Sequence, residues 1–361
     1  MLIISIVATL LITIVTVLPL FKFKHWIVRG MDFPRLQIAF LAGALLLVHV
    51  IFLDLTLNVT YLFIYAATTL CLLWQLWWVL PYTVFWRKEV KTSKVMDHNK
   101  TFSVMTANVL QTNHNSGALI DLVSKYQPDI LVTLESDSWW EGRLNVLDAD
   151  MPYSVKCPLD NLYGMHVYSR LPFSEEEISF LVEKDVPSIH LLLTLRTDDN
   201  VQMHFVHPAP PSPTENEEST ERDAELITIA RSVADTEQAV VVTGDLNDVA
   251  WSATTRLFRK ISGLLDPRVG RGMFNTFHAN YPFLRWPLDH LFHSSHFTVK
   301  RILRLPSIGS DHFPLFTELV YSPVRGSEQN GIQTDSEDRK QAKIISDEKD
   351  VSKADVPTPI A

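Results

Sequence analysis

Three long runs of apolar residues dominate the first hundred positions of the chain. Residues 2–21 contain no charged side chain, and further uncharged runs follow at 37–53 and 59–86. A run of about 20 residues is long enough to cross a hydrocarbon core about 30 Å thick as a helix. The third run is rich in tryptophan near its end, as is typical of a helix end at a membrane interface. The pattern therefore predicts a transmembrane anchor of about three helices over residues 1–86.

After this anchor, short apolar runs typical of strands alternate with segments whose apolar residues have helical spacing. After a basic linker at 87–100, residues 101–323 have the pattern of one folded domain. Apolar residues at helical spacing predict helices at 117–126, 221–237 and 253–262. The predicted strands cover residues 102–110, 129–136, 166–170, 189–196, 201–208, 239–248, 288–292, 297–305 and 313–321. Strands that alternate with helices predict an α/β domain.

The last part of the chain, residues 324–361, is polar, mixed in charge and almost free of aromatic residues. Such a composition buries too little apolar surface to offset the entropy lost on ordering. We therefore expect a disordered polar tail.

Charge separates the anchor from the domain. Residues 1–100 carry 9 basic and 4 acidic side chains, whereas residues 101–323 carry 17 basic and 29 acidic ones. The basic residues of the anchor cluster between the first and second runs and after the third run, which lie on the same side of a three-helix anchor. The positive-inside rule then predicts an integral, multi-pass membrane protein with a cytoplasmic domain. A cleaved signal peptide is the alternative for the first run, but two further runs and the missing charged n-region argue against it.

Composition excludes several classes of protein. The chain has only 2 cysteines, too few for a disulfide scaffold or a multi-cysteine metal site. Neither the phosphate-binding loop of nucleotide triphosphatases nor the nucleophile elbow of serine hydrolases occurs. The spacing of His290, His293 and His296 hints at zinc, but strand alternation would place His293 on the opposite face.

Polar residues at the ends of the predicted strands are the candidates for chemistry. They are Asn108, Glu135, His207, Asp245, Asn247, Asp289, Asp311 and His312. Each one alone has a structural explanation, such as a helix cap, a turn or a histidine bonded to the backbone. Glu135 and Asp245, however, end runs that are otherwise apolar, where a carboxylate is costly to bury unless a cation or donors compensate it. Oxygen ligands of this kind suit Mg²⁺, or Mn²⁺, rather than zinc.

Several short motifs, taken together and in order, resemble the endonuclease/exonuclease/phosphatase superfamily, which has the DNase I-like fold. The motifs are TANV (106–109), LVTLES (131–136), YSR (168–170), FVHPAP (205–210), VVVTGDLND (241–248), PLDHLF (287–292) and GSDHFPL (309–315). The preceding apolar runs are similar to those of a multi-pass membrane-anchored branch of that superfamily. The resemblance implies a four-layer αββα sandwich of two mixed sheets, with the site at one end of the sheets.

The resemblance also implies roles for the strand-end residues. Metal binding falls to Asn108, Glu135 and Asp311, and catalysis to His207, Asp245, Asn247, Asp289 and His312. Asn108 and Asn247 would also bind substrate, together with Arg170 of the YSR motif. His290 is a further substrate-binding candidate because it lies next to Asp289 in the sequence. Asp245 and Asn247 would orient and activate the attacking water, and His312, supported by Asp289, would bind the phosphate.

These observations predict a membrane-anchored phosphoesterase that depends on a divalent metal and hydrolyses a phosphodiester or phosphomonoester. The expected partners are the lipid bilayer and a phosphoester substrate, which is a nucleic acid, a phospholipid or a small phosphoester. Residues 256–304 carry a local excess of basic side chains, which could bind the negative charge of any of these three substrates. The alternative is a non-catalytic membrane adaptor that keeps the fold, although such a module has no reason to keep the complete set of site residues.

Overall fold

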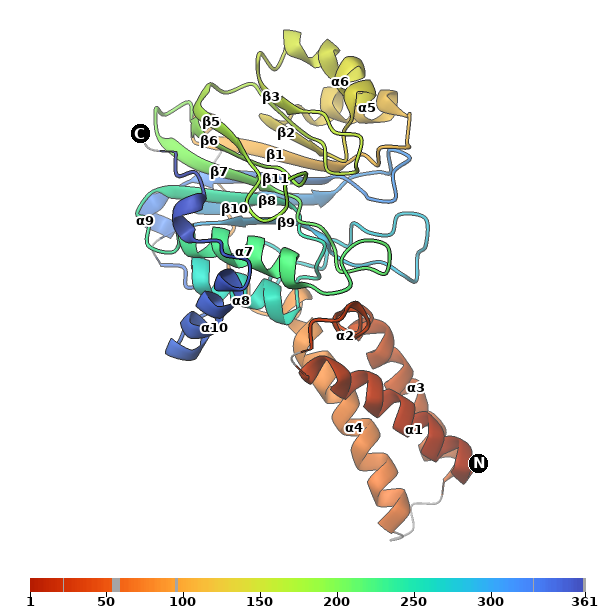
Figure 1. The fold of residues 1–361 in the computed structure, drawn as a ribbon. Coiled ribbons are helices and arrows are strands. Elements are labelled where there is room, and N and C mark those ends of the chain that lie inside the picture. The colour runs from red at the N-terminus through yellow and green to blue at the C-terminus, as the bar shows by residue number, and fades with distance from the viewer. Residues whose placement is uncertain (22, 54–58, 95–96, 327, 360–361) are drawn as a thin grey trace.

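The computed structural model describes residues 1–21, 23–53, 59–94, 97–326 and 328–359. Two β-sheets face each other in a sandwich, and a bundle of long helices extends away from it (Figure 1). The predicted fold class is confirmed, because helices cover the outer faces of both sheets and complete the four layers.

The first sheet contains six strands in the order β10-β11-β1-β2-β4-β3. Strands β1 and β2 run parallel and their other neighbours are antiparallel, so the sheet is mixed. Helices α5 (Ser116–Tyr126) and α6 (Ser138–Leu144) pack on its outer face. The strands are β1 (Thr101–Asn108), β2 (Ile130–Leu134), β3 (Tyr153–Cys157), β4 (Met165–Ser169), β10 (Phe297–Arg304) and β11 (Leu315–Tyr321).

The second sheet has five strands in the order β5-β6-β7-β8-β9, with β7 and β8 parallel. Helices α7 (Thr220–Val233) and α8 (Ala253–Ser262) cover its outer face. Its strands are β5 (Phe173–Ser179), β6 (Ser188–Thr194), β7 (Asn200–Val206), β8 (Ala239–Asp245) and β9 (Asp289–His293). Apolar side chains from both sheets fill the space between them and form the main core.

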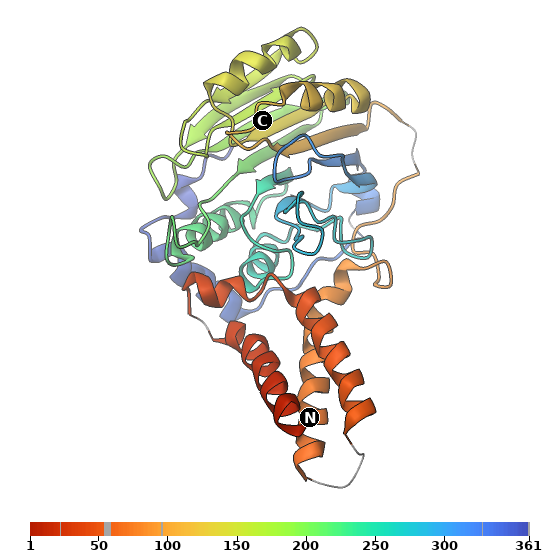
Figure 2. The same ribbon diagram turned by 90° about the vertical axis from the view of Figure 1, so that its right-hand side faces the viewer.

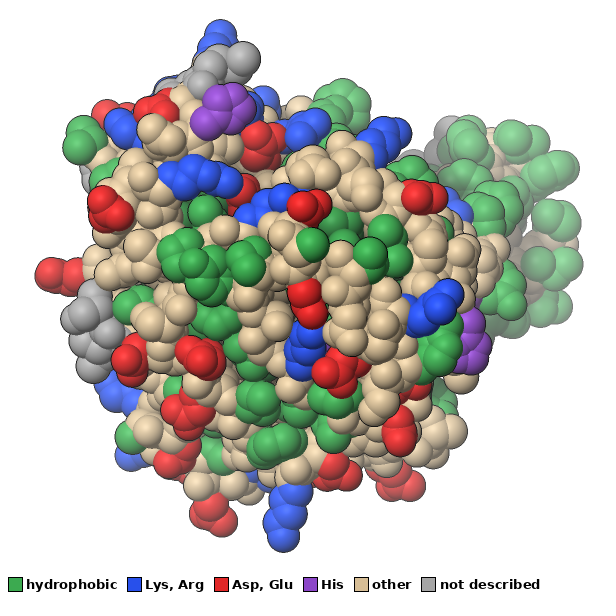
Figure 3. Space-filling model, turned by 90° about the horizontal axis from the view of Figure 1, so that it is seen from above, with side chains coloured by type: hydrophobic (Ala, Val, Ile, Leu, Met, Phe, Trp, Pro, Cys, Tyr) green, Lys and Arg blue, Asp and Glu red, His purple; other side chains and the backbone are tan. Residues whose placement is uncertain are grey.

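The described residues include three helices that are long and apolar enough to cross a membrane, over Leu2–Leu20, Arg35–Phe52 and Val59–Tyr82. They comprise α1 (Leu2–Val17) with η1 (Leu18–Leu20), α3 (Arg35–Phe52), and α4 (Val59–Val79) with η2 (Leu80–Tyr82). Seen from above, this bundle projects beyond one side of the domain and is mostly hydrophobic, whereas the visible face of the domain mixes both charges (Figure 3). Short helix α2 (Trp26–Gly30) connects the first two long helices.

The helix bundle is packed firmly against the domain. The indole of Trp251 donates to the carbonyl of Asp32, 2.8 Å away, and Tyr82 Oη donates to the carbonyl of Ala250 at 2.6 Å. Glu89, in the segment predicted as a basic linker, forms a partly buried ion pair with Arg259 of α8. That segment also contributes Val90 to the main core, so its described part is integrated into the domain.

The prediction of a disordered tail is wrong for the described residues. The tail forms α9 (Pro323–Gly326), α10 (Ser336–Asp347) and η4 (Lys353–Asp355). Ala342 and Val356 are buried against α7 and α8, and Thr228 Oγ1 lies 3.1 Å from Ser346 Oγ. The polar average composition of the tail did not reveal that α10 has a narrow apolar face, which packs against α7 and α8.

Candidate active site

The carboxyl ends of three strands meet where the two sheets touch. Asn108 ends β1, Glu135 follows β2 directly, and Asp245 ends β8. Parallel neighbours bring their carboxyl ends to the same edge of a sheet, which places Asn108 beside Glu135. Just beneath, Thr106 Oγ1 of β1 lies 2.9 Å from Thr243 Oγ1 of β8 and links the two sheets.

Close backbone packing at the end of β8 requires glycine before Asp245. Gly244 has a φ of +150°, and a Cβ there would lie 1.9 Å from the carbonyl oxygen of Val206 on β7. A larger residue would therefore push β8 away from β7 and displace the carboxylate of Asp245.

Asn108 connects the two carboxylates. Its Nδ2 donates to Glu135 Oε1 at 2.7 Å and to Asp245 Oδ2 at 3.2 Å. Its Oδ1 accepts from the backbone N–H of Leu110 at 3.1 Å. Asn108 therefore bridges both acids in this arrangement, with its own oxygen already occupied.

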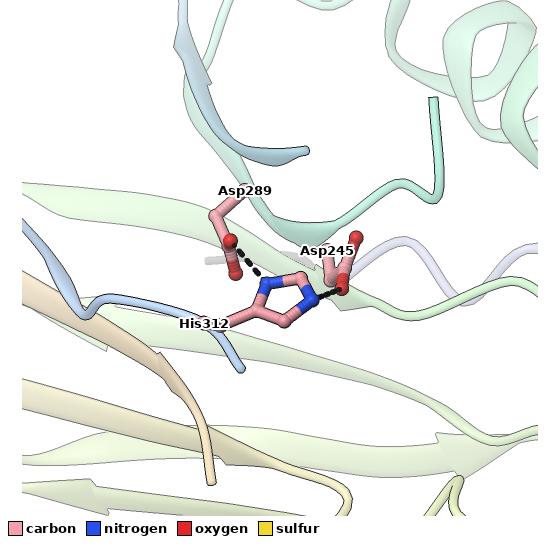
Figure 4. A group of neighbouring side chains, drawn as sticks. All are labelled: Asp245, Asp289 and His312. Atoms are coloured by element: carbon pink, nitrogen blue, oxygen red, sulfur yellow. Dashed lines mark hydrogen bonds and ion pairs between the residues drawn. The ribbon is translucent and has the colours of Figure 1, made fainter. Parts of the chain in front are cut away.

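His312 lies between two buried carboxylates (Figure 4). Its Nδ1 is 2.8 Å from Asp289 Oδ2, and its Nε2 is 3.5 Å from Asp245 Oδ2. Backbone contacts fix this arrangement: His312 N–H donates to Ser310 Oγ, and Asp289 N–H donates to Thr276 Oγ1. The imidazole is thereby oriented with one nitrogen toward each acid.

Electrostatics favour a protonated His312 beside an ionised Asp245. Burial alone would lower the pKa of His312, but the charges of Asp289 and Asp245 outweigh it and raise this pKa to about 10. Burial acts to raise the pKa of Asp245, but the charge of His312 and the hydrogen bonds from Asn247 and Asn108 bring this pKa below its ordinary value. At neutral pH the centre therefore holds a carboxylate and an imidazolium.

Glu135 is a carboxylate whose ionised form lacks full compensation. Burial raises its pKa to about 7, although the hydrogen bond from Asn108 opposes the shift. Its backbone has a φ of +58°, a left-handed conformation that is costly for a residue other than glycine and is often found at functional sites. A nearby cation would keep this acid ionised.

Two residues fix the segment after β8: Asn247, which was predicted, and Arg222, which was not. Asn247, also with a positive φ of 50°, donates from Nδ2 to the carbonyl of Pro208 at 3.0 Å. Arg222 of α7 is fully buried, and its Nη1 donates to the carbonyl of Asn247 at 2.9 Å and lies 3.5 Å from Asp248. The sequence did not predict this role, because Arg222 looks like any charged residue on an amphipathic helix.

His207 completes the buried wall of the site. Its Nε2 lies 4.0 Å from Asp245 Oδ2, and its ring is 5.3 Å from that of Tyr163. Burial lowers the pKa of His207 to about 4, so it is neutral at pH 7. Tyr163 was also absent from the predicted site, since it lies in a loop with no motif.

Two groups of residues could hold a divalent cation. Asp245, Asp289 and His312 offer ligand atoms within 4.8 Å of one another, and they form the one such cluster among the described residues. The hydrogen bond from His312 to Asp289 already uses one nitrogen of that cluster. Glu135 and half-buried Asp311 form the second group, since they lie close enough for the charge of Asp311 to raise the pKa of Glu135. Their carboxylate oxygens fit a hard cation.

Two sequence predictions are wrong. Arg170 follows β4, whose last residue Ser169 pairs with Ile130 at the start of β2, so it lies at the opposite end of the sheet from Glu135. There its Nε donates to the carbonyl of Pro128. Arg170 belongs to the YSR motif of the family, but that motif does not lie at the candidate active site.

His290 alternates with Asp289 along β9 and faces the other side of the sheet. Its Nε2 lies 2.9 Å from the carbonyl oxygen of Asp248 and its Nδ1 lies 2.6 Å from Arg268, so both nitrogens are occupied and buried. His290 is therefore not available to bind substrate at the candidate active site. The hint of a zinc site at His290, His293 and His296 also finds no cluster among the described residues.

Comparisons with known proteins found a matching family model and similar folds. The sequence model of the Endonuclease/Exonuclease/phosphatase family matches residues 105–312, which is more than half of the chain. No curated protein matches the chain.

Three solved structures are similar in fold. The human Nocturnin catalytic domain with bound sulfate has a TM-score of 0.51 at 16% identity, over 63% of this chain and 97% of that one. D. rerio TDP2 with single-strand DNA product has a TM-score of 0.50 at 15% identity, over 61% and 98%. An endonuclease/exonuclease/phosphatase from Beutenbergia cavernae has a TM-score of 0.50 at 15% identity, over 62% and 72%.

Proposed function

The chain belongs to the endonuclease/exonuclease/phosphatase family, and from this premise we propose that it is a membrane-anchored phosphoesterase that depends on Mg²⁺ or Mn²⁺. The observation that supports the proposal best is the convergence of Asn108, Glu135, Asp245 and His312 from four separate segments into one site. A non-catalytic adaptor would not need this arrangement. The three apolar helices support the anchor.

The residues of the site can perform hydrolysis by in-line attack of water. Ionised Asp245 accepts the proton of the attacking water, and Asn247 keeps the Asp245 carboxylate oriented through its backbone N–H, 2.9 Å from Oδ1. Protonated His312 stabilises negative charge that develops on the phosphoryl oxygens. Neutral His207, whose Nε2 lies 4.0 Å from Asp245 Oδ2, would act toward the leaving group.

Glu135 and Asp311 would hold the metal, with Asn108 keeping Glu135 in position. The metal, when bound, would neutralise the phosphoryl oxygens as a Lewis acid. The donor set consists of oxygens, which is the reason for choosing Mg²⁺ or Mn²⁺.

Substitution of Glu135 by glutamine should raise the Mg²⁺ concentration needed for half-maximal activity by at least about tenfold, because one anionic ligand is lost. The measurement is the rate of hydrolysis of bis(p-nitrophenyl) phosphate by the full chain in detergent, as a function of added Mg²⁺. E176Q, which changes an exposed acid on β5, serves as the matched control and should behave as wild type. An unchanged Mg²⁺ dependence of E135Q would remove Glu135 from the metal site.

We also propose that the domain lies on the cytoplasmic side. Basic residues near the domain-side ends of the anchor helices support this orientation by the positive-inside rule. Fusion of a reporter protein to the C-terminus tests it: a cytoplasmic reporter should be active and a periplasmic or lumenal one inactive. The reverse pattern would overturn the orientation without affecting the chemistry.

A further inference from the structure

The loop formed by residues 275–286, between α8 and β9, presents an apolar tip. Phe283 is 88% exposed, and Tyr281 and Leu284 are exposed as well. Residues 271–287 contain no aspartate or glutamate, so no acid in this segment opposes contact with a membrane. Exposed aromatic side chains of this kind usually mark a surface that contacts a partner or a lipid interface.

The 275–286 loop lies beside the point where an apolar helix would enter the bilayer. Gln37, two residues after the start of α3, donates from Nε2 to the carbonyl of Phe283 at 2.8 Å. Phe33, just before α3, packs edge-on against Trp286 with the ring centroids 5.7 Å apart. Figure 2 shows the loops before β9 above the domain-side ends of the anchor helices. The apolar tip is therefore continuous with the surface of the anchor.

The base of the same loop packs against the candidate active site. The ring of Phe277 lies 4.9 Å from that of His312 and 6.3 Å from that of Trp286. The backbone N–H of Ala279 donates to the carbonyl of Asp311 at 2.6 Å. Contacts thus run without a break from His312 through Phe277 and Trp286 to the anchor.

Two arginines, one in the loop and one at the end of β10, lie over the residue that follows His312. Arg285 and Arg304 both lie over the ring of Phe313, with guanidinium carbons 5.0 and 4.5 Å from its centroid. Arg285 donates to the carbonyls of His278 and Ala279, and Arg304 donates to the carbonyl of Asn275. Among the described residues, neither arginine forms an ion pair with a carboxylate. Arginines without an acidic partner are suited to binding phosphate groups. Most of the other basic residues of the 256–304 stretch, in contrast, are used within the domain, as Arg259 is with Glu89.

We propose that the 275–286 loop rests in the bilayer interface and that the active site acts on phosphoesters of membrane lipids. The inference rests on the phosphoesterase function proposed above and names its substrate class. Phe283 and its neighbours would hold the site at the headgroup level, while Arg285 and Arg304 would bind the phosphates of lipids presented there.

The test compares activity toward a lipid with activity toward a soluble ester, using the full chain in proteoliposomes. The vesicles contain phosphatidylcholine with lysophospholipid, sphingomyelin or phosphoinositide, and bis(p-nitrophenyl) phosphate is the soluble substrate. Serine replaces the two apolar tip residues in F283S/L284S, whereas V146S changes an exposed valine of η3 (Asn145–Ala149), on the part of the domain that carries α6. We expect F283S/L284S to hydrolyse lipid about tenfold more slowly and the soluble ester at the wild-type rate. V146S should match wild type on both.

A spectroscopic measurement tests the loop independently of catalysis. An environment-sensitive fluorophore attached at F283C, in a chain carrying C71A and C157A, should shift to shorter wavelength in proteoliposomes and be quenched by lipid nitroxides. The same label at V146C should do neither.

The outcomes separate the two proposals. Hydrolysis of the soluble ester or single-stranded DNA without hydrolysis of any vesicle lipid would keep the phosphoesterase function and overturn the lipid substrate. Equal lipid rates for wild type and F283S/L284S, or an unquenched label at F283C, would overturn the role of the loop. Absence of turnover of every substrate would overturn the proposed function itself.

Discussion

Substitution of Asp245 by asparagine should lower kcat/KM for phosphoester hydrolysis by at least about 10². Asparagine keeps the size of the side chain and can still accept from the N–H of Asn247, 2.9 Å from Oδ1. It cannot accept the proton of water at neutral pH, and it removes one of the two negative charges that face His312. Both losses act on the transition state, so kcat should fall more than KM rises.

Steady-state kinetics of the full chain in detergent, with bis(p-nitrophenyl) phosphate and Mg²⁺, measure this effect. D121N alters an exposed aspartate on α5 and provides the matched control. Thermal unfolding midpoints within a few degrees of wild type would show that D245N still folds. A folded D245N enzyme with wild-type kcat/KM would exclude Asp245 as the base.

Substitution of His312 by alanine should cost a similar factor, at least about 10² in kcat. The variant removes the imidazolium that lies between Asp245 and Asp289, and with it the donor for phosphoryl oxygens. H98A, at an exposed position before β1, is the control. Wild-type turnover by a folded H312A enzyme would remove this residue from the mechanism.

The variant D289N separates the charge of His312 from its presence. The charge of Asp289 is the largest of those that raise the pKa of His312, so its neutralisation should lower that pKa. A required imidazolium is lost as pH rises through its pKa, which is about 10 in the wild-type protein. The alkaline limb of the pH–rate profile should therefore move to lower pH in D289N. An unshifted limb would show that protonation of His312 does not control the rate.

Much of this site was predictable because its residues end apolar strands. A carboxylate directly after a run such as that of β2 or β8 is costly to bury, and the cost itself points to a compensating partner. The sequence therefore predicted that Glu135 and Asp245 have functional partners. It could not predict that Asn108 links them, because the contact depends on how two sheets pack.

The failures have physical causes of other kinds. β3 and β5 lie at the edges of their sheets, and β5 carries three consecutive exposed acids, so neither shows the apolar run of a central strand. Helix α10 is stabilised by burial against α7 and α8, which lie about a hundred residues earlier in the sequence. Arg170 and His290 belong to motifs of the family, but strand direction and alternation take these two away from the site.

The most direct test of the account is the hydrolysis of bis(p-nitrophenyl) phosphate by the purified full chain, with Mg²⁺ added and then removed by EDTA. The account predicts turnover that EDTA abolishes, that added Mg²⁺ restores, and that exceeds the rate of D245N by at least about 10². Turnover that is indifferent to EDTA, or equal in wild type and D245N, would contradict the claim that this group of acids and His312 forms a metal-dependent phosphoesterase site.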